Sequence, residues 1–418
     1  MLQYPNVLND IFDKLLELSI EPIIVGGYVR DFFLHKESKD IDIELYGISS
    51  YAKLENILKE FGEVNSVGKS FGVCKLKAFG LELDFSFPRR DSKVSMGHSG
   101  FKIEIDRTLD FKTATSRRDF TINSIGYSLL TQKFLDPFSG MDDLEKKILK
   151  VVDSSKFAQD PLRILRAVQF SARFDVVPNQ ELVKLCHNMI EHGMLEELPR
   201  ERIFEEFKKL FLKSDAPSKG LVLLKEFGAL NFFSELQALS KGEFVSLLES
   251  LDTMASLEVN NHKTKLTLMF GLVCYELQEK SVYSFLDRFT NDKKFIHKVF
   301  SFIVYAKKIN LKYFTTYDVY TLATQVVVEE FCFFLEALYT KKEEKVKIEY
   351  LKALAKELNV LEKPLKRVLE GKDLIMLGLQ PSPKFSNILE HVYEAQMQGK
   401  CKNKKEALLY VKYHYETV

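Results

Sequence analysis

The chain has 418 residues, of which 46% are hydrophobic and 28% charged, and its formal net charge is +1. This composition excludes a disordered chain and predicts a globular protein of about two to four domains. The five cysteines are scattered without a C-x-x-C pair, which argues against a disulfide framework or a zinc site. The start of the chain lacks the pattern of a secretion signal, and no apolar run is long enough to span a bilayer. We therefore expect a cytoplasmic protein that is not bound to a membrane.

Charge is distributed unevenly along the chain. Residues 1–50 carry four Lys or Arg against nine Asp or Glu, a net of −5, whereas residues 351–418 carry twelve against eight, a net of +4. An acidic start suits metal binding, and a basic end suits a polyanionic partner such as RNA.

Residues 22–35 predict a tight turn between a strand and a helix. An apolar run at 22–25 reads as a short buried strand, Gly26 and Gly27 interrupt it, and 28–35 has the apolar spacing of a helix. Such a turn lets backbone N–H groups approach a phosphate closely, and Arg30 could reach the same phosphate. A purely structural turn explains the glycine pair equally well.

Residues 40–45 alternate strictly between acidic and apolar side chains. In a strand, Asp40, Asp42 and Glu44 would share one face, and the alternation at 81–87 adds Asp84 from a neighbouring strand. Adjacent carboxylates repel one another, and two Mg²⁺ ions that clamp a transferring phosphoryl group would relieve this repulsion. The alternative is a solvated strand face with no function.

The remaining residues up to 150 mix short helices and strands. We expect helices at 7–18 and 50–61 and strands at 63–67, 71–78 and 81–87. A long polar loop is expected at 88–99. The segment 117–123 is rich in groups that contact phosphate, ribose and base, and a turn at 136–140 precedes a helix. Beyond residue 153 the pattern is almost wholly helical, which makes the fold class α+β.

An ordered set of motifs resembles the class II tRNA nucleotidyltransferases (CCA-adding enzymes) and the bacterial poly(A) polymerases related to them. The matching segments are 26–31 with Asp40-x-Asp42, then 117–123, 136–144, 160–167, 201–206 and 371–381. These segments span most of the chain.

The resemblance implies an α/β nucleotidyltransferase head with a mixed sheet, followed by an all-helical neck, body and tail. The expected boundaries are 1–145 for the catalytic head, 146–210 for a neck that recognises the nucleotide base, 211–325 for the body and 326–418 for a tRNA-binding tail. The implied reaction adds CCA to the 3′ end of tRNA from CTP and ATP, releases pyrophosphate and uses no nucleic-acid template. No obligatory protein partner is expected.

The resemblance also implies roles for individual residues. Asp40 and Asp42 would hold Mg²⁺, and Asp84 would be the third catalytic carboxylate. The residues expected to bind the nucleotide are Gly26, Gly27, Arg30, Arg117, Arg118, Asp119, Asn123, Asp160, Arg163 and Arg166.

Asp160 and Arg163 form a pair whose chemistry can be examined directly. At i and i+3 they share a helix face, and the carboxylate accepts hydrogen bonds whereas the guanidinium only donates them. Cytosine and adenine each present an amino donor beside a ring-nitrogen acceptor, but uracil and guanine present a carbonyl and a ring N–H. One Asp–Arg pair would therefore select C and A together. The alternative is a helix-capping Asp with a surface Arg.

The sequence departs from the family pattern at three places. Gln159 stands where Glu is usual, and Gln169 where Arg is frequent. Many bacterial members also carry a His-Asp phosphohydrolase site in the body, but this chain has no His-Asp dipeptide. His262 and His297 are therefore expected to be solvated or core histidines.

Two further functions stay open from the sequence. Addition of A alone, either to tRNA or as a poly(A) tail, would use the same base contacts. An inactive tRNA-binding protein on this scaffold is the third possibility, although the complete set of carboxylates argues against it.

Overall fold

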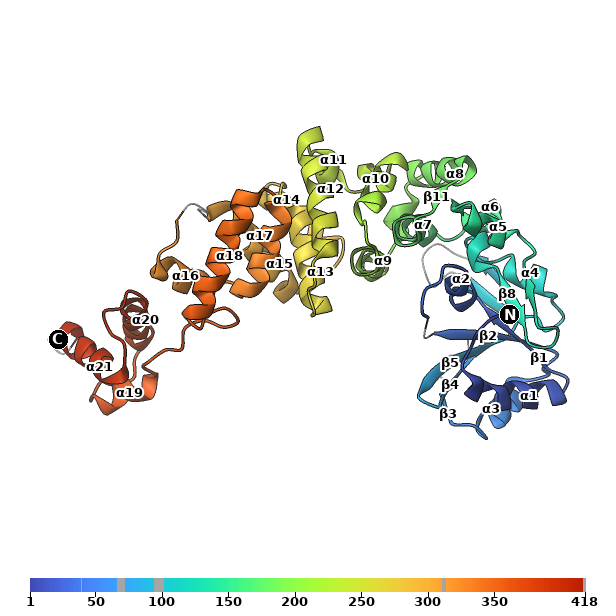
Figure 1. The fold of residues 1–418 in the computed structure, drawn as a ribbon, viewed down its shortest axis with the longest axis horizontal. Coiled ribbons are helices and arrows are strands. Elements are labelled where there is room, and N and C mark those ends of the chain that lie inside the picture. Colours follow the sequence, from blue (N-terminus) through green and yellow to red (C-terminus); the bar gives the residue numbers. More distant parts are fainter. Residues whose placement is uncertain (39, 66–71, 94–100, 310–312, 416–418) are drawn as a thin grey trace. The chain divides into compact units, whose positions relative to one another are not determined.

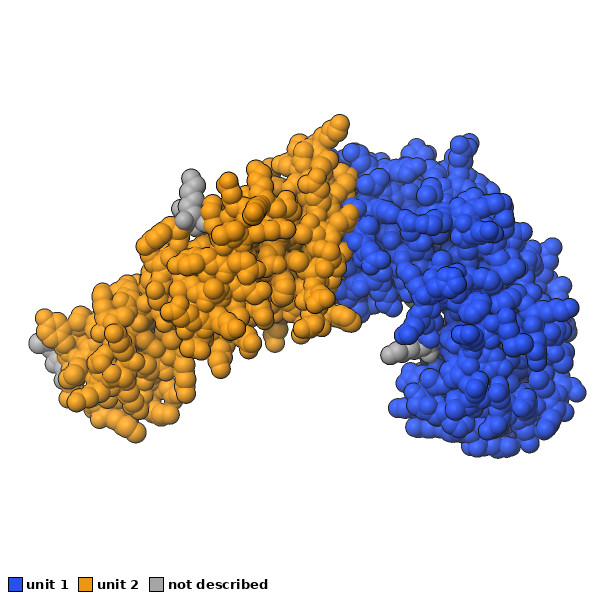
Figure 2. Space-filling model, in the orientation of Figure 1, with its two compact units in different colours: residues 1–237 blue, residues 238–418 orange. Residues whose placement is uncertain are grey.

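A computed structural model describes residues 1–38, 40–65, 72–93, 101–309 and 313–415. The chain forms two compact units, residues 1–237 and 238–418, which Figure 2 shows in separate colours. The predicted boundaries of head, neck, body and tail remain a prediction.

Unit 1 begins with a mixed sheet of seven strands in the order β3-β4-β5-β2-β1-β8-β9 (Figure 1). The strands are β1 (Glu21–Val25), β2 (Ile41–Tyr46), β3 (Glu63–Asn65), β4 (Val73–Ala78), β5 (Leu81–Ser86), β8 (Gly126–Ser128) and β9 (Lys133–Leu135). Only β2 and β5 pair in parallel; the other neighbours are antiparallel. The prediction of an α+β fold with a mixed sheet in the head is confirmed.

Unit 1 also contains eleven α-helices in its described residues. They are α1 (Asn9–Glu17), α2 (Gly27–Phe33), α3 (Tyr51–Leu58), α4 (Phe111–Thr115), α5 (Gly140–Glu145), α6 (Ser154–Phe157), α7 (Leu162–Phe174), α8 (Gln180–Glu191), α9 (Arg200–Lys213), α10 (Ser218–Glu226) and α11 (Ser234–Gln237).

The alternation seen in the sequence explains how β2 sits in the sheet. Ile41, Ile43 and Leu45 are buried on one face, because a strand places every second side chain on the same side. Helix α1 buries Ile11 and Leu15 and contacts β1, which supplies part of the core beneath the sheet. Apolar packing on one face thus leaves the other face of β2 for polar side chains.

Three features of the head differ from the sequence-based expectation. The stretch predicted as a loop at 88–99 contains β6 (Arg89–Lys93), which pairs with β7 (Phe101–Ile105) in a separate antiparallel sheet; residues 94–99 lie outside the described residues. The short strands β8 and β9 were not predicted. A parallel pair, β10 (Ile148–Leu149) and β11 (Val177–Pro178), also adds strand pairing outside the head sheet.

Helices α7 and α9 pack against each other beyond the sheet (Figure 1). Helix α7 is joined to the head by buried aromatic side chains: the ring of Phe120 lies 5.7 Å from that of Phe157 and 5.4 Å from that of Phe170. This cluster packs helices α6 and α7 against the 117–123 segment.

All regular secondary structure in the described residues of unit 2 is helical. Its helices are α12 (Lys241–Ser256), α13 (His262–Cys274), α14 (Glu279–Asp287), α15 (Lys293–Lys308), α16 (Thr316–Ala323), α17 (Val328–Leu338), α18 (Lys342–Glu357), α19 (Gly371–Met376), α20 (Lys384–Met397) and α21 (Lys404–Tyr415). The last three share a small core of their own, which includes Leu374, Val392 and Val411. In the part of the chain that the structure describes, no helix is both long and apolar enough to cross a membrane.

Candidate active site

A polar pocket of about 460 Å³ lies in unit 1, where the head sheet meets helices α7 and α9. Its walls include most of the residues that the sequence singles out. The lining residues are Gly26, Gly27, Arg30, Asp42, Arg89, Arg117, Arg118, Asp119, Asn123, Asp160, Leu162, Arg163, Arg166 and Arg202. Segments far apart in the sequence thus converge on one cavity whose charge is mainly positive, as a triphosphate requires.

The glycine pair forms the expected turn between β1 and α2. Gly26 has φ of +71° and ψ of −127°, a conformation that side chains larger than hydrogen rarely adopt. A Cβ atom there would lie 2.8 Å from the Nη1 atom of Arg118. Glycine is therefore required for two reasons: the backbone conformation and the close approach of the Arg118 guanidinium.

Replacing Gly26 by alanine is expected to destabilise the protein by about 1–3 kcal/mol, because of the strained backbone, and to displace Arg118. Urea denaturation measures the first effect, and the KM for nucleotide measures the second. Gly242→Ala is the matched control, since an added Cβ there has no neighbour within 4 Å. Equal stability of the Gly26 and Gly242 variants would contradict this account of the turn.

The predicted carboxylates lie along neighbouring strands. Asp42 of β2 is directly opposite Asp84 of the parallel strand β5, and Lys75 of β4 lies beside Asp84 with its Nζ 2.8 Å from the Asp84 carboxylate. Asp40 is exposed and precedes the first residue of β2. Asp40 and Asp84 do not line the pocket itself, so Asp42 is the carboxylate that faces it.

The environment of Asp42 disfavours its negative charge. Loss of hydration raises the pKa of its carboxyl, although the side chain retains contact with solvent. The positive charge of Arg118 lowers this pKa, whereas the negative charges of Asp84 and Asp40 raise it further. Such a carboxylate gains from a bound cation. Among the described residues, however, no group of three or more acidic, His or Cys side chains is placed to hold a metal. Mg²⁺ commonly uses one or two carboxylates together with phosphate oxygens and water, so a pair of Asp residues still fits this ion.

Glu44 has a different role from the other acidic residues of the alternating segment. Its side chain is fully buried, accepts a hydrogen bond of 2.5 Å from the Tyr46 hydroxyl and lies 3.2 Å from Nη2 of Arg117. Glu44 alternates onto the same face of β2 as Asp42, but its side chain is buried, whereas Asp42 is exposed. Arg117 neutralises the charge of Glu44, and this ion pair also holds the Arg117 side chain at the pocket.

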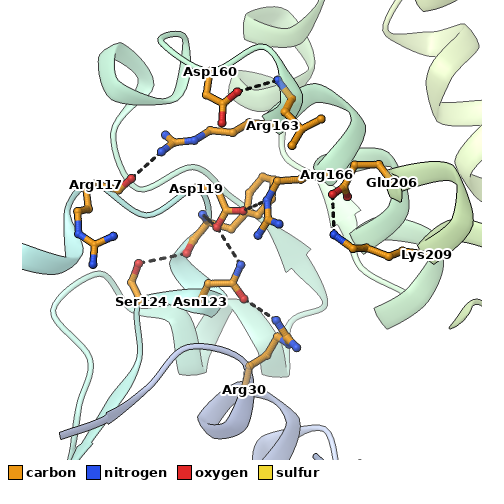
Figure 3. Close-up of polar contacts among 12 residues, drawn as sticks. Arg30, Arg117, Asp119, Asn123, Ser124, Asp160, Arg163, Arg166, Glu206 and Lys209 are labelled. Carbon is orange, nitrogen blue, oxygen red and sulfur yellow. Dashed lines mark hydrogen bonds and ion pairs between the residues drawn. The ribbon is translucent and has the colours of Figure 1, made fainter. Parts of the chain in front are cut away.

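A buried chain of polar side chains connects the Gly-Gly helix to α7 (Figure 3). Arg30 donates to the Asn123 amide oxygen at 2.6 Å, the Asn123 nitrogen donates to Asp119 at 2.8 Å, and Nε of Arg166 donates to the same carboxylate at 2.6 Å. Arg30 is only 5% exposed and also bonds to Asp31. In this structure Arg30, Asp119 and Asn123 line the pocket but use their polar groups mainly on one another.

The charge of Asp119 is maintained by its partners. Burial alone would raise the pKa of its carboxyl, but Arg166 and the hydrogen bond from Asn123 outweigh burial and hold the pKa below its ordinary value. The network therefore stays ionised at neutral pH and keeps the pocket wall rigid.

Replacing Asn123 by alanine is expected to lower the free energy of unfolding by about 2–4 kcal/mol, because a buried N–H of Arg30 and part of Asp119 lose their partners. Chemical denaturation monitored by circular dichroism measures this loss. Asn56→Ala on the exposed face of α3 is the control and should cost less than about 0.5 kcal/mol. Similar losses of unfolding free energy in the two variants would show that the buried network does not stabilise the protein more than an exposed side chain does.

The proposed base-reading pair lies at the beginning of α7. Asp160 accepts the backbone N–H of Leu162 at 3.1 Å, so it caps the first turn of the helix. Arg163 donates to the carbonyl oxygen of Arg117 at 2.6 Å (Figure 3). It also donates to the carbonyl oxygen of Lys156 at 3.0 Å. Both side chains line the pocket, and the two carbonyls hold the Arg163 guanidinium in one orientation.

Sequence reasoning missed two arginines of the pocket. Arg89 belongs to the stretch that was predicted as a loop, and Arg202 lies on α9, 42 residues from its partner Asp160. Only the match of segment 201–206 to a family motif indicated that Arg202 has a special position. Of the two glutamine departures from the family pattern, Gln169 lies within α7; it is 1% exposed, and its Oε1 has no hydrogen-bond partner among the described residues.

Three family models match successive parts of the chain. Residues 23–150 match the poly(A) polymerase head domain, 179–239 the RNA and SrmB binding site of polymerase A, and 259–411 the tRNA nucleotidyltransferase domain 2. Together these matches cover most of the residues that line the pocket and most of the helical part; Asp160, Leu162, Arg163 and Arg166 lie between the first and second matches. The chain belongs to the class II tRNA nucleotidyltransferase and poly(A) polymerase family.

Known family members resemble the chain over different lengths. A multifunctional CCA protein of Neisseria gonorrhoeae is 34% identical over 211 residues, which are 50% of this chain and 49% of that protein. The chain thus matches about half the length of such curated relatives. A CCA-adding enzyme of Lactococcus lactis is 29% identical over 95% of this chain and 94% of its own length.

Solved structures of family members share the fold. The Bacillus stearothermophilus CCA-adding enzyme in complex with CTP superposes with a TM-score of 0.75 at 19% identity, covering 99% of this chain and all of that one. The Thermotoga maritima CCA-adding enzyme complexed with tRNA gives 0.67 at 22% identity, with 98% and 96% covered. These likenesses establish the architecture of this nucleotidyltransferase.

Helix α13 of the body contains no His-Asp dipeptide. Its C-terminal residues Val273 and Cys274 are fully buried among apolar neighbours. His262 and His297 are exposed, so they are solvated surface histidines and not core residues.

Proposed function

We propose that this nucleotidyltransferase adds CCA to the 3′ end of tRNA from CTP and ATP, without a nucleic-acid template. The observation that supports this most directly is the meeting of three features in one pocket: the acidic strand β2, the arginine-rich 117–118 segment and the Asp160–Arg163 pair. A nucleoside triphosphate matches each feature in turn. Its phosphate can bind a cation held by β2, its remaining negative charge suits the arginines at 117–118, and its base edge can bond to the Asp160–Arg163 pair.

The reaction is a nucleotidyl transfer. The 3′-hydroxyl oxygen of the RNA forms a bond to the α-phosphorus of the nucleotide, the bond to the bridging oxygen breaks, and pyrophosphate leaves with that electron pair while the hydroxyl proton is released. Asp40 and Asp42 would hold Mg²⁺, which supplies charge neutralisation at the transferring phosphate when bound. Asp84 keeps a second carboxylate beside Asp42, and Lys75 holds it in place.

The cationic wall of the pocket orients the triphosphate. Arg118 lies against Gly26, and in the described part of the chain its Nε has no hydrogen-bond partner although it is buried. An unpaired buried donor is costly, and phosphate oxygens would satisfy it. Arg117, held by Glu44, adds a second guanidinium beside it.

The Asp160–Arg163 pair gives the preference for C and A. A carboxylate accepts from the exocyclic amino group, and a guanidinium donates to the neighbouring ring nitrogen. Uracil and guanine would oppose acceptor to acceptor and donor to donor at both positions. Sites built around such hydrogen bonds reject the mismatched partner strongly.

The experiment that tests this proposal uses tRNA that ends at the discriminator base, incubated with each nucleoside triphosphate and then with all four. We expect two C residues with CTP alone and a complete CCA end with CTP and ATP together. Addition of A only to tRNA that already ends in CC would identify an A-adding enzyme, and long A tracts would identify a poly(A) polymerase. No addition to any RNA would overturn the proposal.

We further propose that the C-terminal helices bind the tRNA by contacting its phosphates. Helix α21 carries Lys405 and Lys412 two turns apart on one exposed face, with the exposed Leu409 between them. The cysteines are all free and buried, which fits a reducing compartment, and we place the reaction in the cytoplasm.

Replacing Lys405 and Lys412 together by glutamate is expected to weaken tRNA binding. The slope of log binding constant against log salt concentration should become shallower by roughly one for each lost phosphate contact. Filter binding at several salt concentrations measures both quantities. The charge-conserving pair Lys405→Arg and Lys412→Arg serves as the control and should bind normally. Unchanged affinity of the glutamate variant would remove α21 from the tRNA-binding surface.

A further inference from the structure

Arg202 contacts the carboxylate that is proposed to read the base. Its Nη1 and Nη2 atoms lie 3.4 and 3.3 Å from the Oδ1 and Oδ2 atoms of Asp160, so the guanidinium faces both oxygens. The two side chains are 22% and 20% exposed, and both line the pocket. An ion pair at this depth is screened less by water than one at the surface, so its geometry affects the site.

The carboxylate of Asp160 still has room for a further donor. Oδ1 accepts the N–H of Leu162 as well as Arg202, whereas Oδ2 accepts only from Arg202 in the described residues. Each carboxylate oxygen can accept two hydrogen bonds. The amino group of a base can therefore bond to Oδ2 while Arg202 stays in place, and Arg202 need not be displaced by the nucleotide.

The helix that carries Arg202 is firmly anchored. Ile203, Phe207 and Leu210 of α9 are buried, and α9 packs along α7. One turn after Arg202, the Glu206 side chain is almost fully buried and pairs with Lys209 at 2.7 Å (Figure 3). The guanidinium thus projects toward Asp160 from a rigid base, as a residue that orients another residue must.

We propose that Arg202 is a positioning residue for base selection, which fixes the plane of the Asp160 carboxylate so that Oδ2 faces the amino group of C or A. This inference rests on the proposed function. With Arg202 present, rotation of the carboxylate would break two contacts. Without it, the carboxylate turns away from the base edge, and the site loses part of its discrimination against U and G.

A double-mutant cycle tests this role. The variants are Arg202→Ala, Asp160→Ala and the two combined. For each we measure kcat, KM and the nucleotide preference, which is the efficiency of C and A addition divided by that of U and G addition. We expect Arg202→Ala to reduce that preference about tenfold, mainly through KM, and to have little further effect once Asp160 is absent. Arg202→Lys keeps the charge and should recover part of the preference.

Lys208→Ala is the matched control, because Lys208 lies on the same helix and pairs with Glu205 outside the pocket. It should match the wild type. An unchanged preference in Arg202→Ala, or equal losses in the presence and absence of Asp160, would overturn the inference, since a residue that only stabilises the fold acts independently of Asp160. Melting temperatures identify a variant that fails to fold, and Arg202→Gln and Arg202→Lys then replace it.

The design also separates the two proposals. If the wild-type protein adds no nucleotide to any RNA, the proposed function fails, but the binding constants of CTP, ATP, UTP and GTP can still be compared across the same variants. If the wild type adds C and A normally and the cycle is additive, only the role of Arg202 fails.

Discussion

Replacing Asp42 by asparagine is expected to reduce addition of both C and A to below about one per cent of the wild-type rate, on the scale of losses for metal-assisted transfer. Asp42 is the carboxylate of β2 that lines the pocket, and Asp84 faces it in register. Single-turnover addition of each nucleotide measures the effect. Glu82→Ala removes an exposed carboxylate from β5 and should leave the rate unchanged.

The same substitution is expected not to destabilise the protein at neutral pH. Because the pKa of Asp42 is raised in the folded state, the folded protein retains this proton at pH values where the unfolded chain has lost it. Ionisation of Asp42 therefore lowers stability as the pH rises from about 3.8, the ordinary value, through the raised one. Asparagine cannot ionise, so its melting temperature at pH 7 should equal or exceed that of the wild type. An inactive variant that is also unstable would mean that Asp42 acts through packing.

Replacing Asp160 or Arg163 should change which nucleotides are accepted. Asp160→Ala removes the acceptor that clashes with the carbonyl oxygen of U or G, and Arg163→Ala removes the donor that opposes their ring N–H. Each variant should lose about ten- to a hundredfold in efficiency with CTP and ATP and gain relative misincorporation of UTP or GTP. Single-nucleotide addition with the four triphosphates measures this change.

The structure requires companion variants for this experiment. Asp160 also caps α7, and Arg163 also bonds to two backbone carbonyls, so alanine at either position removes structural contacts as well. Asp160→Asn keeps the cap while it replaces one acceptor by a donor. Arg163→Lys keeps the positive charge but loses the planar arrangement of donors. If every variant retains the full preference for C and A, the base is read elsewhere.

Local sequence patterns determined much of the architecture. Alternation at 40–45 predicted the strand that carries Asp42, and the alternation at 81–87 predicted that Asp84 would lie on a neighbouring strand. The glycine pair predicted a turn, which is observed with Gly26 at positive φ. Helical periodicity beyond residue 153 predicted the helical remainder. These features follow from the sequence because they depend on contacts that repeat every two or every three to four residues.

The tertiary structure decided how the polar groups of the pocket are paired. Glu44 is separated from Arg117 by 73 residues, and Arg163 from the carbonyl of Arg117 by 46. The strand β6 forms in a polar stretch without alternation because β7 supplies its hydrogen-bond partners. Whether an acidic side chain binds a cation or an arginine depends on which distant segment the packing brings beside it. Residue periodicity carries no information about such neighbours, since they are fixed only when the apolar faces of separate elements pack together.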